Sequence, residues 1–269
     1  MQDLPNELVV QGAVAPFAVG VALAAALVRL RLSGLAAVGG FLIAAFLIGS
    51  LSFWPLTATR KILLLAILAP ALGVIVDLAF KPRQAAGLLL AAFFALASVW
   101  VFWSVLAQRP VGEAIALGGG VAAFVFWTVA FTTALHAEPL RVGANGLALG
   151  LGAGIGAVLG ASAVLGIFGI ALAAGTGGFL LVAMIRGKRV TGGMTLALSV
   201  SVISALIAAG ALVLANSPWW SLAVLSLAPL AARLPVPERA PAWLQAIVVS
   251  LYTLAVAAAY CVLAWKFAA

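Results

Sequence analysis

Charged residues are scarce in this 269-residue chain: only 7% of its residues are charged, whereas 66% are hydrophobic. A soluble domain carries about 25% charged residues, so this chain has too few to cover a surface in water. Fourteen Lys and Arg against six Asp and Glu give a formal net charge of +8. These basic residues gather at the ends of apolar runs, which indicates membrane topology and contact with anionic lipid rather than nucleic-acid binding.

Cysteine and histidine are almost absent, since Cys261 and His136 are the only ones. One cysteine excludes an intrachain disulfide and a thiolate metal cluster. Two such residues far apart in the sequence do not indicate a zinc, haem or nucleophile site. The chain also lacks a nucleophile beside a base, two carboxylates within one helix, and a phosphate-binding glycine loop. We therefore expect no metal, no cofactor and no enzymatic activity.

Apolar runs fill the chain instead, and most are close to the 20 residues or so that one bilayer crossing needs. They predict an all-α, polytopic transmembrane bundle of about ten helices, in one integral membrane domain that covers residues 1–269. Nine helices remain an alternative, if the glycine-rich segment is one long kinked element or the ninth run is re-entrant. The predicted spans are Val9–Leu30, Leu35–Phe53, Ile62–Phe80, Ala85–Ala107, Ala114–Leu135, two within Gly143–Ile185, Thr195–Ala215, Ser221–Ala232 and Trp243–Trp265.

The stretch Gly143–Ile185 carries no charge, and from Gly143 to Gly160 a glycine recurs every two to four residues. No hydrophobic force drives helix association in lipid, and close backbone approach along small residues replaces it. We therefore expect two helices pressed together at the centre of the bundle, with a break near Gly166. The glycines expected to pack are Gly146, Gly150, Gly152, Gly156 and Gly160.

The distribution of basic residues predicts the orientation of ten helices. An outside N-terminus places ten Lys and Arg on the cytoplasmic side and four on the other, so the positive-inside rule favours N-out and C-out. The cytoplasmic set is Arg29, Arg31, Lys81, Arg83, Arg141, Arg186, Lys188, Arg189, Arg233 and Arg239. The helices can divide into two halves of five, 1–137 and 138–269, although no residue match supports an internal repeat.

Few polar side chains lie within the predicted spans, and these are the candidates for a substrate path. Asp77 is either a proton or cation site, or it reaches the surface and pairs with Lys81. His136 and Glu138 could relay protons or bind a cation, but they also suit a solvated turn. Hydroxyls in helices usually bond to carbonyls of their own helix, yet they can also line a path for a solute. The residues that we expect to line this path are Asp77, Trp127, Thr128, Thr132 and Ser201.

Two functions are compatible with this pattern. One is a small secondary transporter or permease of a bacterial-type inner membrane, for a neutral, zwitterionic or lipid-like solute. In that case we expect a cavity near mid-bilayer, enclosed by the fifth to eighth helices and lined by Thr132, Ser201 and Trp127. The alternative is a non-catalytic subunit or assembly factor, with other membrane proteins or further copies of the chain as partners. The lack of buried charge supports the alternative, because ion-coupled carriers usually place ionisable groups at the midplane. The ten-helix architecture favours the transporter, which is the function that we expect.

Overall fold

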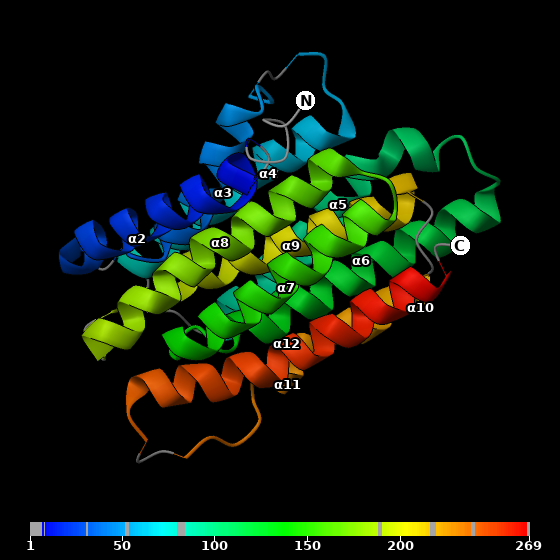
Figure 1. Ribbon diagram of the computed structural model, residues 1–269. Helices are drawn as coiled ribbons and strands as arrows, with labels where there is room; N and C mark the ends of the chain where they lie inside the picture. The colour runs from blue at the N-terminus through cyan, green and yellow to red at the C-terminus, as the bar shows by residue number, and fades with distance from the viewer. Residues whose placement is uncertain are drawn as a thin grey trace.

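The computed structural model describes residues 7, 9–30, 32–51, 54–79, 84–187, 190–215, 219–237 and 240–267. Within these residues it contains helices and no strand, and the helices lie roughly along one common direction (Figure 1). The expectation of an all-α, polytopic membrane bundle is therefore confirmed.

Eight of the described helices are long and apolar enough to cross a bilayer. They are the segment Val10–Leu30, which comprises η1 (Val10–Val14), α2 (Ala15–Leu27) and η2 (Val28–Leu30), then α4 (Ala58–Ala79), α5 (Gln84–Leu106), α6 (Val111–Thr133), α7 (Pro139–Leu159), α8 (Ala163–Arg186), α9 (Gly193–Ala215) and α12 (Ala242–Phe267). Shorter helices occupy two predicted spans: α3 (Leu35–Leu47), and the pair α10 (Trp219–Leu225) and α11 (Ala228–Ala231). The beginning of α2 and the end of α12 lie at the same end of the bundle (Figure 1).

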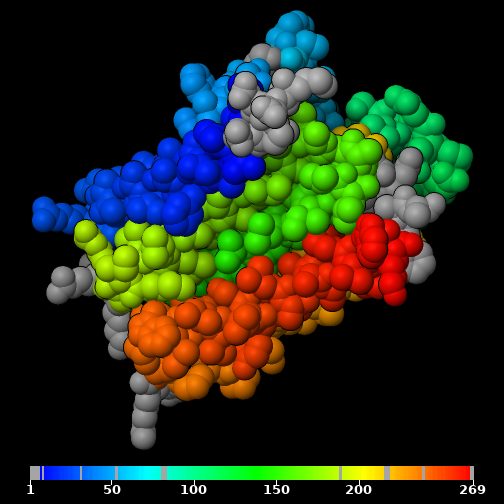
Figure 2. All heavy atoms as spheres, in the orientation of Figure 1, coloured from blue at the N-terminus to red at the C-terminus, as the bar shows by residue number. Residues whose placement is uncertain are grey.

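Helix α9 is the most enclosed element. It packs against α3, α4, α5, α6, α7, α8 and α10, and almost all of its residues are buried. In the space-filling view α2, α8 and α12 cover one face, and α9 is nearly hidden (Figure 2). A helix that is apolar all round and carries only small or aliphatic side chains and a few hydroxyls is suited to this position. The expectation that the glycine-rich pair forms the centre is wrong in this respect, because α7 and α8 flank the central helix.

The glycine-rich pair α7 and α8 does pack backbone against backbone. A Cβ atom placed on Gly169 would lie 2.4 Å from Cα of Gly154, and one on Gly150 would lie 2.9 Å from the amide nitrogen of Ala173. Only hydrogen fits at such distances, which is the close approach that small residues permit between membrane helices.

The other predicted packing glycines serve different neighbours. Gly146 faces Val200 of α9, and Gly156 accommodates Tyr260 of α12. Gly152 lies closest to Leu225 of α10, with α12 at ordinary contact distance. Gly160 is the C-cap residue of α7 and begins the turn before α8. One helix thus uses separate glycine faces for α8, α9 and α12.

Two predicted boundaries are wrong. The break between α7 and α8 falls at residues 160–162 and not near Gly166, which is helical and buried. The turn closes through Ala161 in the left-handed region, with φ 64°, and the amide of Ser162 donates to the carbonyl of Ala157 at 2.8 Å. The second helix ends at Leu47 because Gly49 turns the chain with φ 72°. Residues 48–51 are not helical, so the helix does not reach the predicted end at Phe53, which itself lies outside the described residues.

The contacts of the bundle interleave the two predicted halves. Helix α8 packs against α2 and α3, and α9 packs against α4 and α6. Orientation across the bilayer, the exact number of crossings and the division into halves stay predictions.

Candidate functional site

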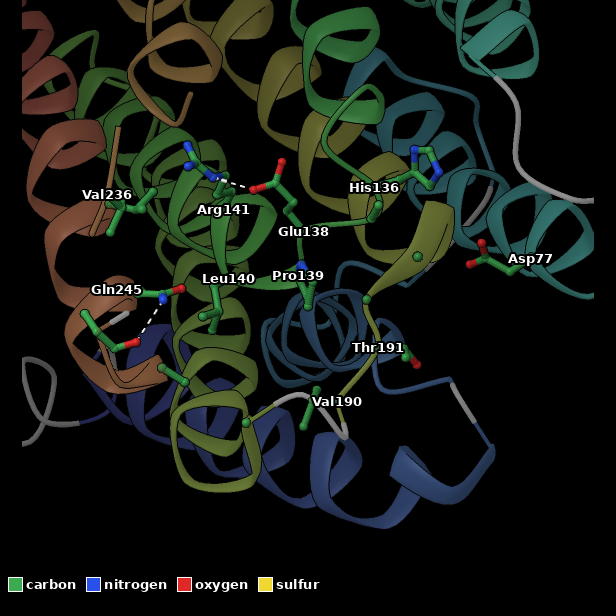
Figure 3. Close-up of a pocket in the computed structure, with 17 residues that line it drawn as sticks. Asp77, His136, Glu138, Pro139, Leu140, Arg141, Val190, Thr191, Val236 and Gln245 are labelled. Carbon is green, nitrogen blue, oxygen red and sulfur yellow. Dashed lines mark hydrogen bonds and ion pairs between the residues drawn. The ribbon is translucent and has the colours of Figure 1, made fainter. Parts of the chain in front are cut away.

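The polar side chains of several helices meet in a pocket at one end of the bundle, with a volume of about 890 Å³. Its walls come from the end of α4, the α6–α7 turn, the segment before α9, and the start of α12 (Figure 3). The volume lies within the range of small-molecule sites. The polar lining residues are Asp77, His136, Glu138, Arg141, Thr191 and Gln245.

Asp77 joins this pocket to the central helix. Its carboxylate accepts hydrogen bonds from the amide of Met194 at 2.8 Å and from the amide and hydroxyl of Thr195 at 2.9 and 2.7 Å. These donors form the first turn of α9, whose free amides and positive dipole end favour a carboxylate. This role differs from both roles predicted for Asp77, an ion site or an ion pair with Lys81. Through Asp77, helix α4 provides the N-terminal cap of α9. The alternative partner, Lys81, lies outside the described residues.

Glycines make this contact between α4 and α9 possible. A Cβ atom on Gly73 would lie 2.5 Å from Cα of Thr195, and one on Gly193 would lie 2.4 Å from a carboxylate oxygen of Asp77. Gly193 also adopts φ 60°, which favours glycine. On the other side, the Ser33 hydroxyl donates to the carbonyl of Thr191 at 2.8 Å. The segment that forms one pocket wall is thereby held from two sides.

Arg141 occupies the opposite wall, and its charge is already compensated. Its Nε pairs with Glu138, and Nη1 donates to the carbonyls of Ala232 and Leu234 at 2.6 and 3.0 Å. Arg141 therefore ties the start of α7 to the chain after α11. One carboxylate oxygen of Glu138 takes part in this ion pair, and its side chain is about half exposed.

The bonding of His136 defines what its ring presents to the pocket. Nδ1 lies 2.9 Å from the carbonyl oxygen of Thr133. A carbonyl can only accept, so Nδ1 carries the proton in the neutral ring, and Nε2 is then an acceptor.

A strip of polar side chains leads inward from the pocket. Four residues beyond Arg141, the amide of Asn145 donates to the Thr132 hydroxyl at 2.9 Å. Thr128 lies four residues before Thr132 on α6, whereas His136 lies in the turn that follows α6. Residues four apart share one helix face about 6 Å apart along the axis. Asn145, Thr132 and Thr128 are fully buried. In the part of the chain that the structure describes, Oδ1 of Asn145 and Oγ1 of Thr128 have no hydrogen-bond partner.

The two remaining candidates do not join this strip. Ser201 is fully buried, and its hydroxyl donates to the carbonyl of Ala197 in its own helix at 2.6 Å. Trp127 is 37% exposed, stacks on Phe131, and donates from its indole to the carbonyl of Ser226 at 3.0 Å. None of the three pockets described is lined by Thr132, Ser201 or Trp127, so a shared mid-bilayer cavity stays a prediction.

Four site residues were not indicated by the sequence pattern: Asn145, Arg141, Thr191 and Gln245. Asn145 is the only amide side chain in Gly143–Ile185. That isolation is a usable signal, because a strongly polar group inside an apolar span needs a partner in lipid. Arg141 enters the sequence argument only as a topology marker, since its carbonyl partners lie some ninety residues away.

The orphaned hydroxyl of Thr128 gives a stability prediction. We expect Thr128→Val to leave the protein as stable as before or to raise its unfolding temperature in detergent, because it removes a buried polar atom that lacks a bond. Thr133→Val is the matched control on the same helix. Its hydroxyl donates to the carbonyl of Val129 at 2.8 Å, so its loss should cost about 1 kcal/mol. Equal destabilisation by both variants would contradict the assignment.

In comparisons with known proteins, no family model, no curated protein and no solved structure matches this chain. Its function must therefore be inferred from the chain's own residues. On that ground the protein is a multi-pass helical membrane protein with a polar pocket at one end.

Proposed function

We propose that the protein is a permease of a bacterial-type cytoplasmic membrane, and that it takes a small neutral or zwitterionic solute from the end pocket. The observation that carries this proposal is the buried polar strip of Thr132 and Thr128, with Asn145 beside it, which lies below the half-buried His136 of the pocket. A buried polar atom without a partner costs about 1–3 kcal/mol. Lipid offers it no substitute partner, so an apolar residue would serve packing better. A path that opens to water or solute supplies the missing bonds.

The pocket itself narrows the solute class. Its lining combines two carboxylates, an arginine, an imidazole and an amide, which suit a polar molecule better than a lipid-like one. The described conformation is then the closed one, because the strip ends beneath the pocket among fully buried residues.

A second function, that of a non-catalytic membrane subunit, is favoured by the enclosed central helix. Helix α9 is surrounded by seven helices, and its hydroxyls at Ser199, Ser201 and Ser204 bond back to carbonyls of α9. A solid centre of this kind suits a protein that only holds partners together.

Cysteine accessibility separates the two functions. With Cys261 replaced by alanine, Thr132→Cys should react with a small membrane-impermeant thiol reagent in native membranes, because an open state admits water to the strip. Val129→Cys is the matched control, since Val129 is equally buried on α6 but offers no polar group. Labelling should be at least about tenfold faster at position 132.

Equal labelling at both positions would indicate general loosening of the bundle and count against a path. No labelling at position 132, together with stoichiometric co-purification of other membrane proteins, would favour the subunit instead.

A further inference from the structure

The end pocket presents hydrogen-bond acceptors and negative charge more than donors. Arg141 is engaged by Glu138 and by two carbonyl oxygens. Asp77 is bonded only by amides and a hydroxyl, and no side-chain cation within the described ranges pairs with it. Among the described residues, the charge of Asp77 is therefore met only by these hydrogen bonds and by the N-terminal dipole of α9.

The remaining acceptors come from the turn between α6 and α7, which carries His136 and Glu138. His136 offers Nε2 as an acceptor, because its Nδ1 is bonded to the Thr133 carbonyl. Glu138 keeps a second carboxylate oxygen beyond its ion pair with Arg141. In Figure 3 the His136 side chain lies between those of Glu138 and Asp77. A ligand that complements these acceptors carries a positive charge and several N–H or O–H donors.

We propose that the pocket binds a solute through a primary ammonium group held by Asp77 and His136, with a second donor directed to Glu138. The inference rests on the proposed function only in that it takes this pocket as the solute site. A primary ammonium supplies three N–H donors and one positive charge, whereas a quaternary ammonium supplies charge alone. The substrate class is thus small solutes with a primary ammonium group. It includes zwitterionic amino acids, which belong to the solute class proposed above, and cationic amines, amino alcohols and diamines, which extend it.

The carboxylate of Asp77 connects the ligand pocket with the central helix α9. Asp77 bonds to both the first amides of α9 and the pocket, so an ammonium group that shares its oxygens draws electron density away from the α9 cap.

Thermal stabilisation of the purified full-length protein, at constant ionic strength, tests the proposal. The probes are ethanolamine, 1,4-diaminobutane, tetramethylammonium and acetate. Ethanolamine and 1,4-diaminobutane should raise the unfolding temperature saturably, whereas tetramethylammonium, which lacks N–H donors, and acetate should not. Acetate tests the opposite preference, for an anion, because the basic residues Lys188 and Arg189 adjoin pocket residues in the sequence.

The variants identify the residues responsible. Asp77→Asn should weaken amine binding about tenfold, since hydrogen bonds to charged groups are the stronger ones. His136→Phe provides a second test if loss of the α9 cap prevents Asp77→Asn from folding, and it should weaken binding several-fold. Glu113→Gln is the control, because Glu113 is an exposed carboxylate in the first turn of α6, away from the pocket.

Stabilisation by acetate instead of the amines, equal stabilisation by tetramethylammonium, no saturable effect of either amine, or an equal loss in Glu113→Gln would each overturn the assignment. These results are separable from the proposed function. If amines bind but Thr132→Cys is not labelled, the ammonium site is supported and the permease function is contradicted. If Thr132→Cys is labelled but amines do not bind, the permease function is supported and the ammonium site is contradicted.

Discussion

Gly169→Ala should lower the free energy of unfolding by about 3 kcal/mol, at the upper end of what overpacking usually costs. The added methyl group would lie 2.4 and 2.5 Å from Cα and N of Gly154 and 2.8 Å from the carbonyl oxygen of Gly150. All three atoms are backbone, so no side chain can rotate away, and α7 and α8 must separate. Loss of unfolding temperature in detergent, or of folded yield, measures the effect.

Gly177→Ala is the matched control on the same helix. A Cβ atom there meets only side-chain atoms, the nearest 3.8 Å away on Leu147, which is an ordinary van der Waals distance. Because alanine is the better helix former by about 1 kcal/mol, this variant should be neutral or slightly stabilising. If both variants lost the same stability, the close contact between α7 and α8 would not be what holds the pair together.

Asp77→Ala should cost about 2–4 kcal/mol. The change removes the acceptor for two amides and one hydroxyl at the start of α9. Hydrogen bonds to a charged group contribute about 1.5–3 kcal/mol, and loss of an N-cap typically costs about 1 kcal/mol. Water at the pocket end can replace part of what is lost, so the sum is not fully realised.

Two further variants separate the loss of the α9 cap from the simple loss of a negative charge. Asp77→Asn keeps an oxygen acceptor and should cost only about 1 kcal/mol. Glu113→Ala removes an exposed carboxylate from α6 and should stay within about 0.5 kcal/mol. A loss in Asp77→Ala no larger than that in Glu113→Ala would show that α9 does not depend on this cap.

The candidate site could be predicted only in part. Asp77, Thr128 and Thr132 stand out in the sequence because polar groups are rare in apolar spans, and the structure puts all three at the end pocket or on the strip below it. Ser201 and Trp127 stand out for the same reason, yet the Ser201 hydroxyl bonds within α9 and the Trp127 indole bonds to the carbonyl of Ser226. Rarity identifies a polar residue but does not indicate which way it faces.

The amino-acid order by itself determined the all-helical membrane class, the positions of the apolar spans, and the glycine-mediated contact between α7 and α8. These depend on composition and on local length, because a bilayer requires about 20 apolar residues for each crossing. Only the tertiary structure decided that α9 is the enclosed helix, that the α7–α8 turn closes at Ala161 and that Asp77 caps α9. Each of these depends on the relative placement of helices. When every span is apolar, hydrophobicity no longer distinguishes inside from outside, and that placement is left to close packing and a few hydrogen bonds.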